Sequence, residues 1–151
     1  MDTLNSIVIK ASPSRIFEAA AQVEAWPTLL SHYRQVRFAA REGDVRLVHM
    51  AAHRDGFPCR WFSLQILFPA EKKIYYRHIR SFWTRGMEVW WSITPLDKQN
   101  RRVTITHSMP DLPRFPFAGW FYRVVIGRIF VHTIAERTLK GLKRHLETGV
   151  V

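Results

Sequence analysis

The sequence predicts an α+β fold in which a curved antiparallel sheet wraps around one long C-terminal helix. Three observations predict it: short alternating apolar segments separated by turn residues, two short helical segments near the start, and an apolar stripe at helical spacing through the last 35 or so residues. The chain has 151 residues, of which 47% are hydrophobic. We therefore expect a single domain over residues 1–151 with a sizeable core.

The N-terminal quarter predicts one strand and two short helices. Residues 4–11 (LNSIVIKA) alternate as a strand does. Ser12 followed by Pro13 predicts an N-cap and the first position of a helix. Proline disfavours helical geometry in the residue before it, so Trp26-Pro27 is expected to break that helix and start a second, which runs to about Tyr33.

Six further strands are expected, which makes about six to seven in all. Gly, Pro, Asn and Asp residues separate them as turn signals, and their short spacing is typical of an antiparallel meander. The predicted ranges are 34–41, 45–54, 59–68, 73–80, 87–94 and 101–109.

The C-terminal segment predicts a continuous helix over residues 117–147, roughly 45 Å long at 1.5 Å per residue. Its apolar stripe includes Trp120 and Val124. A sheet must bury one face, and this helix is the only predicted element large enough to cover it. A strongly bent sheet around one helix would leave a cavity between them.

The element order, with these residues, resembles the helix-grip fold of START-like and birch-pollen-allergen-like proteins, and most of all the polyketide cyclase/dehydrase group. The resemblance rests on NSIVIKASPSRIFEAA, EAWPTLLSHYR, MEVWWSITPL and the C-terminal helix. It implies that Tyr33 lies at the cavity, where aromatase/cyclases use such a tyrosine in cyclisation. Those enzymes also use an arginine in a strand that here matches residues 61–65, and Gln65 stands in its place.

The cavity walls follow from period-two alternation and from the resemblance. For strand 59–68 the two disagree: hydrophobicity turns Phe62, Leu64, Ile66 and Phe68 inward, whereas the resemblance turns Trp61, Ser63 and Gln65 inward. We favour the resemblance, which leaves an apolar outer patch for a partner such as a second copy in a homodimer. The expected cavity residues are Trp26, Leu30, Trp61, Ser63, Met87, Val89, Trp91, Ile105, Trp120 and Val124.

Composition restricts the class of partner. The formal net charge is +11, which predicts attraction to an acidic partner such as an acyl carrier protein or an anionic membrane surface. Nucleic acid is not expected, since the chain has no RNP sequence, helix-turn-helix pattern or Cys-x-x-Cys finger. The seven histidines show no metal-ligand spacing, so neither metal nor cofactor is expected.

Targeting features are also not evident. The start has no signal-peptide pattern, and the most apolar stretch, 115–135, is interrupted by Arg123 and Arg128, which disfavours a membrane span. The one cysteine, Cys59, fits a reducing compartment, so we expect a cytoplasmic protein.

Two functions remain open from sequence. One is binding of a hydrophobic small molecule, such as a lipid, quinone or polyketide-like compound, without chemistry. The alternative is a polyketide cyclase or aromatase that catalyses aldol cyclisation and dehydration, with Tyr33 as acid/base assisted by Gln65, Ser63 or His107. Neutral Gln65 cannot offer a full positive charge to an enolate, and this favours binding.

Overall fold

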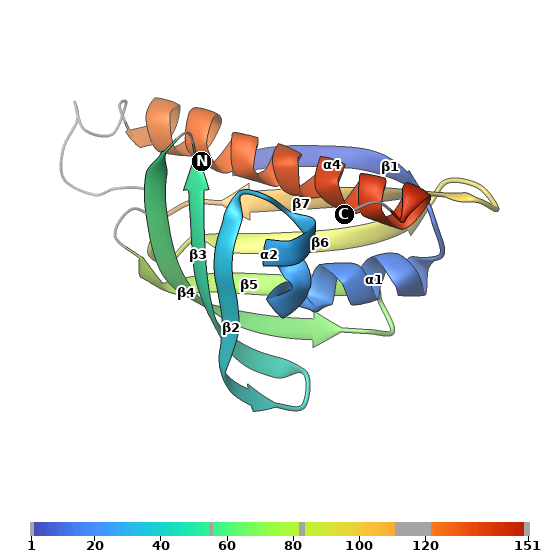
Figure 1. The fold of residues 1–151 in the computed structure, drawn as a ribbon, viewed down its shortest axis with the longest axis horizontal. Coiled ribbons are helices and arrows are strands. Elements are labelled where there is room, and N and C mark those ends of the chain that lie inside the picture. Colours follow the sequence, from blue (N-terminus) through green and yellow to red (C-terminus); the bar gives the residue numbers. More distant parts are fainter. Residues whose placement is uncertain (1, 55, 82–83, 111–121, 150–151) are drawn as a thin grey trace.

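A seven-stranded antiparallel sheet forms the frame of the molecule (Figure 1), in the order β1-β7-β6-β5-β4-β3-β2. The computed structural model describes residues 2–54, 56–81, 84–110 and 122–149. The strands are β1 (Asp2–Lys10), β2 (Tyr33–Glu42), β3 (Val45–Arg54), β4 (Phe57–Phe68), β5 (Lys73–Ser81), β6 (Glu88–Pro95) and β7 (Asn100–Ser108). The predicted fold class is confirmed, and the strand ends differ from prediction by one or two residues.

The helices between β1 and β2 differ from the prediction in where they end. Helix α1 (Pro13–Ala21) begins as expected, because the Ser12 Oγ accepts the Arg15 N–H at 3.3 Å. A short 3-10 turn η1 (Val23–Ala25) and helix α2 (Trp26–Leu29) follow. Proline does not break a helix at Trp26, whose backbone is helical (φ −58°, ψ −39°). Pro27 instead occupies the first turn of α2, where its missing N–H costs nothing.

The second short helix is also shorter than predicted. Leu30 is extended (φ −128°, ψ 105°), so α2 ends before it, and Tyr33 opens strand β2. Trp26 is held by burial and by its indole N–H, which donates to the Ala19 carbonyl at 3.0 Å. These contacts fix the segment that brings Tyr33 to the sheet.

The C-terminal helix is not one regular α-helix. Residues Tyr122–Val131 form a π-helical segment, η2, which continues into α4 (His132–Thr148). The α-helix ends where Gly149 takes the left-handed conformation (φ 68°) and donates its N–H to the His145 carbonyl. The predicted start, residues 117–121, lies outside the described residues.

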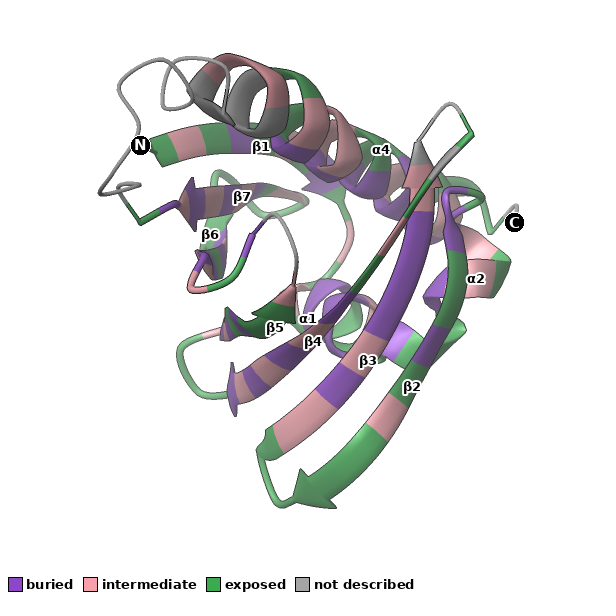
Figure 2. Ribbon diagram, turned by 90° about the vertical axis from the view of Figure 1, so that its left-hand side faces the viewer, coloured by how far each residue is buried: buried purple, intermediate pink, exposed green. Residues whose placement is uncertain are grey.

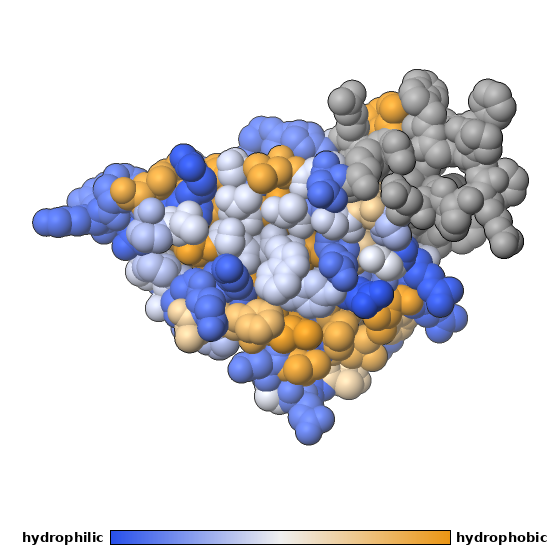
Figure 3. Space-filling view, turned by 180° about the vertical axis from the view of Figure 1, so that it is seen from behind, coloured by the Kyte–Doolittle hydropathy of each residue, from blue (hydrophilic) through white to orange (hydrophobic). Residues whose placement is uncertain are grey.

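The curved sheet and α4 bury one shared core (Figure 2). On β4 the resemblance predicted the correct face: Trp61, Ser63 and Gln65 are buried, while Phe62 and Leu64 are half-buried on the outer face. From behind, hydrophobic side chains form a band bordered by hydrophilic ones (Figure 3). Trp61 and Ser63, on the inward face of β4, line a cavity that residues of α4 close on the other side.

Candidate ligand cavity

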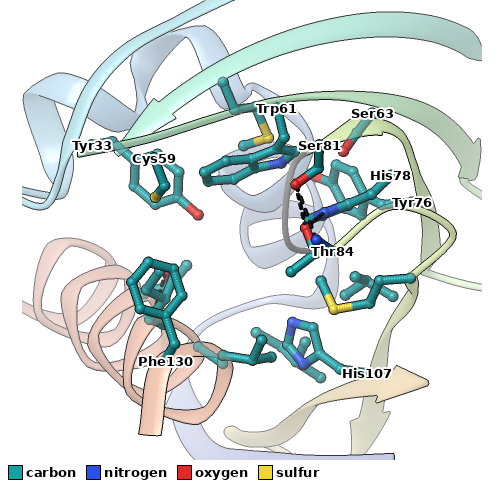
Figure 4. Close-up of a pocket in the computed structure, with 18 of the residues that line it drawn as sticks. Tyr33, Cys59, Trp61, Ser63, Tyr76, His78, Ser81, Thr84, His107 and Phe130 are labelled. Carbon is teal, nitrogen blue, oxygen red and sulfur yellow. Dashed lines mark hydrogen bonds between the residues drawn. The ribbon is translucent and has the colours of Figure 1, made fainter. Parts of the chain in front are cut away.

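A cavity of about 230 Å³ lies between the concave face of the sheet and the C-terminal helix. Tyr33 and Trp61 lie on one side of it, and Phe130 and His107 on the other (Figure 4). Most of its wall is aromatic or aliphatic, which suits an apolar ligand with few polar groups. The lining residues are Trp26, Tyr33, Met50, Pro58, Cys59, Arg60, Trp61, Ser63, Tyr76, His78, Ser81, Thr84, Met87, Val89, Trp91, Ile105, His107, Phe130, Val131, Ile134, Ala135 and Thr138.

Tyr33 is packed among aromatic rings at the start of β2. Its ring centroid lies 5.1 Å from that of Trp26 and 6.3 Å from that of Trp61, and the side chain is 6% exposed. Burial raises the pKa of the Tyr33 hydroxyl above its ordinary value of 10, and the Thr138 hydroxyl opposes that shift only in part. A phenol in this environment stays protonated near neutral pH. It can donate a hydrogen bond, but the raised pKa makes it a weaker acid than an exposed tyrosine, and in its protonated form it is a poor base.

Two histidines face the cavity, and both are held neutral. Burial lowers the pKa of His107 from 6.5 to about 4 and that of His78 to about 3. The His78 Nδ1 lies 2.7 Å from the Thr84 Oγ1, which lies 2.8 Å from the Ser81 Oγ. This chain of hydroxyls fixes the His78 ring (Figure 4). Uncharged imidazoles with such low pKa values are weak proton acceptors at neutral pH.

Among the described residues, three polar atoms in the cavity wall are buried without a hydrogen-bond partner: the Trp61 Nε1, the Ser63 Oγ and the His107 Nδ1. A buried polar group that lacks a partner costs about 1–3 kcal/mol. A ligand with an oxygen placed beside these groups would supply that partner. The wall is thus apolar overall, with polar groups at a few defined points.

The sequence matches the model of a known protein family. The family described as polyketide cyclase / dehydrase and lipid transport matches residues 4–147. The chain belongs to this family. The resemblance inferred from sequence is therefore confirmed, and it extends over almost all of the described residues.

Individual relatives of this family are distant. A granaticin polyketide synthase bifunctional cyclase/dehydratase from Streptomyces violaceoruber is 26% identical over 105 residues, 68% of this chain but only 32% of that protein. The Zhui aromatase/cyclase from Streptomyces sp. R1128 superposes with a TM-score of 0.80 at 16% identity, over 99% of this chain and 97% of that one. A protein from Thermus thermophilus gives a TM-score of 0.84 at 19% identity, over 100% of both chains.

Gln65, which the sequence resemblance matched to an arginine of aromatase/cyclases, faces inward but does not line the cavity. Its side chain is fully buried, and its amide donates to the Tyr76 hydroxyl at 2.9 Å and to the Ala21 carbonyl at 3.2 Å. The Arg46 Nη1 lies 3.5 Å from the Gln65 Oε1. Gln65 therefore ties β4 to β5 and α1, and its predicted catalytic role has no geometric support.

The other predicted residues fall into three groups. The structure brings Trp26, Tyr33, Trp61, Ser63, Met87, Val89, Trp91, Ile105 and His107 together around the cavity. Leu30 is 2% exposed but packs against α4 at Gly141, away from the cavity. Val124 is half-buried in η2 and does not line the cavity. Trp120 lies outside the described residues.

Sequence reasoning missed several wall residues, above all His78, Tyr76 and Thr138. A signal for the first two existed: they alternate with Ile74 along β5, which places all three on its buried face. Thr138 lies on α4, where helical spacing does not distinguish a cavity residue from a core residue.

The described part of the chain shows neither a metal site nor a membrane-spanning helix. There, no group of three or more His, Cys, Asp or Glu side chains could hold a metal ion. No described helix is both long and apolar enough to span a bilayer.

Proposed function

We propose that this protein binds a hydrophobic small molecule, of lipid, quinone or polyketide-like chemistry, in the cavity between the sheet and the C-terminal helix. One observation carries the proposal: a cavity of about 230 Å³ whose mostly apolar wall contains unpaired buried polar atoms. Apolar surface removed from water drives binding at roughly 25 cal/mol per Å². The unpaired Trp61, Ser63 and His107 atoms favour a ligand with one or two oxygens.

The electrostatics support binding over chemistry. Among the described residues that line the cavity, Arg60 is the one with a permanent charge, and it is exposed at the rim. Enolate formation needs a base and a positive group or strong donors at the developing oxyanion. The neutral His78 and His107 and the protonated Tyr33 supply donors but no strong base.

The proposal is tested by what the purified protein carries. Native mass spectrometry should show a mass above that of the chain alone, and organic extraction should release the compound responsible. Recovery of empty protein that also fails to take up any lipid, quinone or aromatic polyketide would refute the proposal.

The alternative, a polyketide cyclase or aromatase, is supported by family membership and by Tyr33 at the cavity wall. In that case Tyr33→Phe should abolish turnover of a polyketide-like substrate, because the phenol is the acid, and should leave binding unchanged. Turnover is followed by the absorbance of the aromatic product. Equal turnover by Tyr33→Phe would exclude this role.

Partners and location belong to the same proposal. A net charge of +11 supports an acidic partner, either an acyl carrier protein or an anionic membrane surface, and the half-buried apolar outer face of β4 supports a homodimer. The single Cys59 fits the cytoplasm. Analytical ultracentrifugation at low and high salt separates self-association from association with an acidic partner.

A further inference from the structure

A second, basic groove adjoins the cavity on the outer side of β4 and β5. Among its lining residues are Arg60, Arg80, Arg85, His49 and Phe62. All three arginines are exposed, and no described residue lining the groove is acidic. The groove shares Arg60, Trp61 and Ser81 with the cavity wall. The two spaces therefore meet at one rim.

Strand register places His49 and Arg80 on either side of Phe62. His49 on β3 pairs with Phe62 on β4, and Phe62 pairs with Arg80 on β5, so the three form one row across the outer face. A register shift follows directly after Phe62 and leaves Ile79 on β5 unpaired, next to Arg80. Such irregularities bend a strand and re-aim the neighbouring side chains. Arg85 reaches the same groove from the connection between β5 and β6.

The positive charge in the groove is not balanced within the described part of the chain. The ion pairs there join Lys140 to Glu136 and Lys143 to Glu147, both on α4. The His49 ring centroid lies 4.6 Å from that of Phe62 with the rings tilted by 33°, and its buried Nδ1 has no hydrogen-bond partner among the described residues. Burial lowers the pKa of His49, and the charges of Arg37 and Arg60 lower it further. The groove thus presents three guanidinium groups and no carboxylate among its described lining residues.

We propose that this groove binds the phosphate group of an amphiphile whose apolar body enters the cavity. Guanidinium groups match phosphate oxygens in paired, charge-assisted hydrogen bonds, and neutral His49 adds a further polar group. The shared rim at Arg60, Trp61 and Ser81 allows one molecule to occupy both spaces. The inference that an apolar body enters the cavity rests on the proposed function, whereas the inference that the groove binds phosphate does not.

The same chemistry has two sources, a phospholipid headgroup and a phosphopantetheine arm. Calorimetry compares two matched pairs: lysophosphatidic acid against the monoacylglycerol of equal chain length, and phosphopantetheine against pantetheine. At least one phosphorylated member should bind about tenfold or more tightly than its uncharged partner. The pair with the larger preference identifies the source.

The decisive variant is Arg80→Gln with Arg85→Gln, since both residues line the groove but not the cavity. It should lose the preference for phosphate and keep the affinity for the uncharged member. Arg102→Gln with Arg77→Gln removes the same charge from exposed positions that line neither space, and should keep the preference. An equal loss in this control would attribute the effect to net charge and overturn the inference, as would a wild type without any preference.

Inorganic phosphate tests the groove without the cavity. Titration should shift the His49 ring-proton resonances in the wild type and not in the Arg80→Gln/Arg85→Gln variant. If neither amphiphile binds but phosphate shifts His49, the groove is supported and the proposed ligand class of the cavity fails. If phosphate shifts no His49 resonance in the wild type, the groove inference is wrong, whatever the cavity binds.

Discussion

Polar side chains in and near the cavity fall into two groups: those that stabilise the fold and those that are available to a ligand. Gln65 and Tyr76 form hydrogen bonds with each other and with carbonyl groups of α1. Trp61, Ser63 and His107 each have a buried polar atom without a hydrogen-bond partner among the described residues. Paired groups stabilise the fold, and unpaired groups lower stability until a partner arrives. The two kinds should respond differently to substitution.

The Gln65→Leu variant tests whether Gln65 stabilises the fold and has no part in binding. Loss of the amide leaves the Tyr76 hydroxyl with only the Ala20 carbonyl at 3.4 Å, so the free energy of unfolding should fall by about 1–3 kcal/mol. Affinity for an apolar ligand should not change, since Gln65 does not line the cavity. Urea denaturation and a ligand titration measure the two effects. Lost affinity with unchanged stability would restore Gln65 to the site.

Stability should also depend on pH through the buried histidines. Burial depresses the pKa of His32, His78 and His107 to about 4, 3 and 4, below the ordinary 6.5. As the pH falls, these histidines therefore take up protons in the unfolded chain at a higher pH than in the folded protein. Their contribution to the free energy of unfolding is fully present above pH ~6.5 and is lost as the pH drops toward ~4. Carboxylates contribute mainly below this window.

Urea denaturation near neutral pH and near pH ~5 measures the effect. The wild type should lose several kcal/mol over this interval, because each pKa unit corresponds to about 1.4 kcal/mol. The double variant His78→Gln/His107→Gln should lose much less. A wild-type midpoint that does not move would show that these histidines titrate normally.

At the scale of elements, the contact between α2 and α4 leaves no room at Gly141. A Cβ at this position would overlap the Leu30 Cδ2, and the Leu29 carbonyl oxygen lies 3.8 Å away. Overpacking costs about 1–3 kcal/mol, while alanine gains about 1 kcal/mol over glycine in a helix. Gly141→Ala should therefore destabilise the protein by up to about 2 kcal/mol.

A double-mutant cycle separates the two terms. In a Leu30→Ala background the overlap disappears, so Gly141→Ala should become neutral or stabilising, as measured by thermal or urea unfolding. If Gly141→Ala were equally destabilising in both backgrounds, Leu30 would not be the cause.

The elements show how far sequence determines this fold. Alternation predicted the strands to within one or two residues, because half-buried strands must alternate. It failed on β4, where Phe62 and Leu64 are more hydrophobic than the inward Ser63 and Gln65, and only the family resemblance gave the correct face. Helical spacing could not distinguish π from α winding in η2, since both place apolar residues three to five apart.

Only part of the candidate site could be predicted from the sequence, again because alternation along strands was the main signal. Residues on the regular strand β6, such as Val89 and Trp91, and Met87 directly before it were placed by alternation alone. Leu30 was not, because its position depends on where α2 ends. Gln65 was assigned to the site because the family resemblance turned it inward, but its hydrogen-bond partners Tyr76 and Ala21 come from elements whose contacts no local pattern specifies.

For the whole molecule, the cavity exists only because sheet and helix close around it. Ala135 on α4 is 3% exposed and lines the cavity, so a phenylalanine there would fill the space. Arg144 is exposed on the same helix, which makes Arg144→Phe a matched control outside the cavity. A ligand that binds only the folded state should also raise the melting temperature.

The most direct test of the account is fluorescence titration with N-phenylnaphthylamine, a neutral apolar probe that does not respond to the basic groove. Wild type and Arg144→Phe should bind it with equal affinity, and Ala135→Phe, checked for folding by circular dichroism, should bind it at least about tenfold more weakly. A folded Ala135→Phe variant that binds the probe as tightly as the wild type would contradict ligand binding in this cavity.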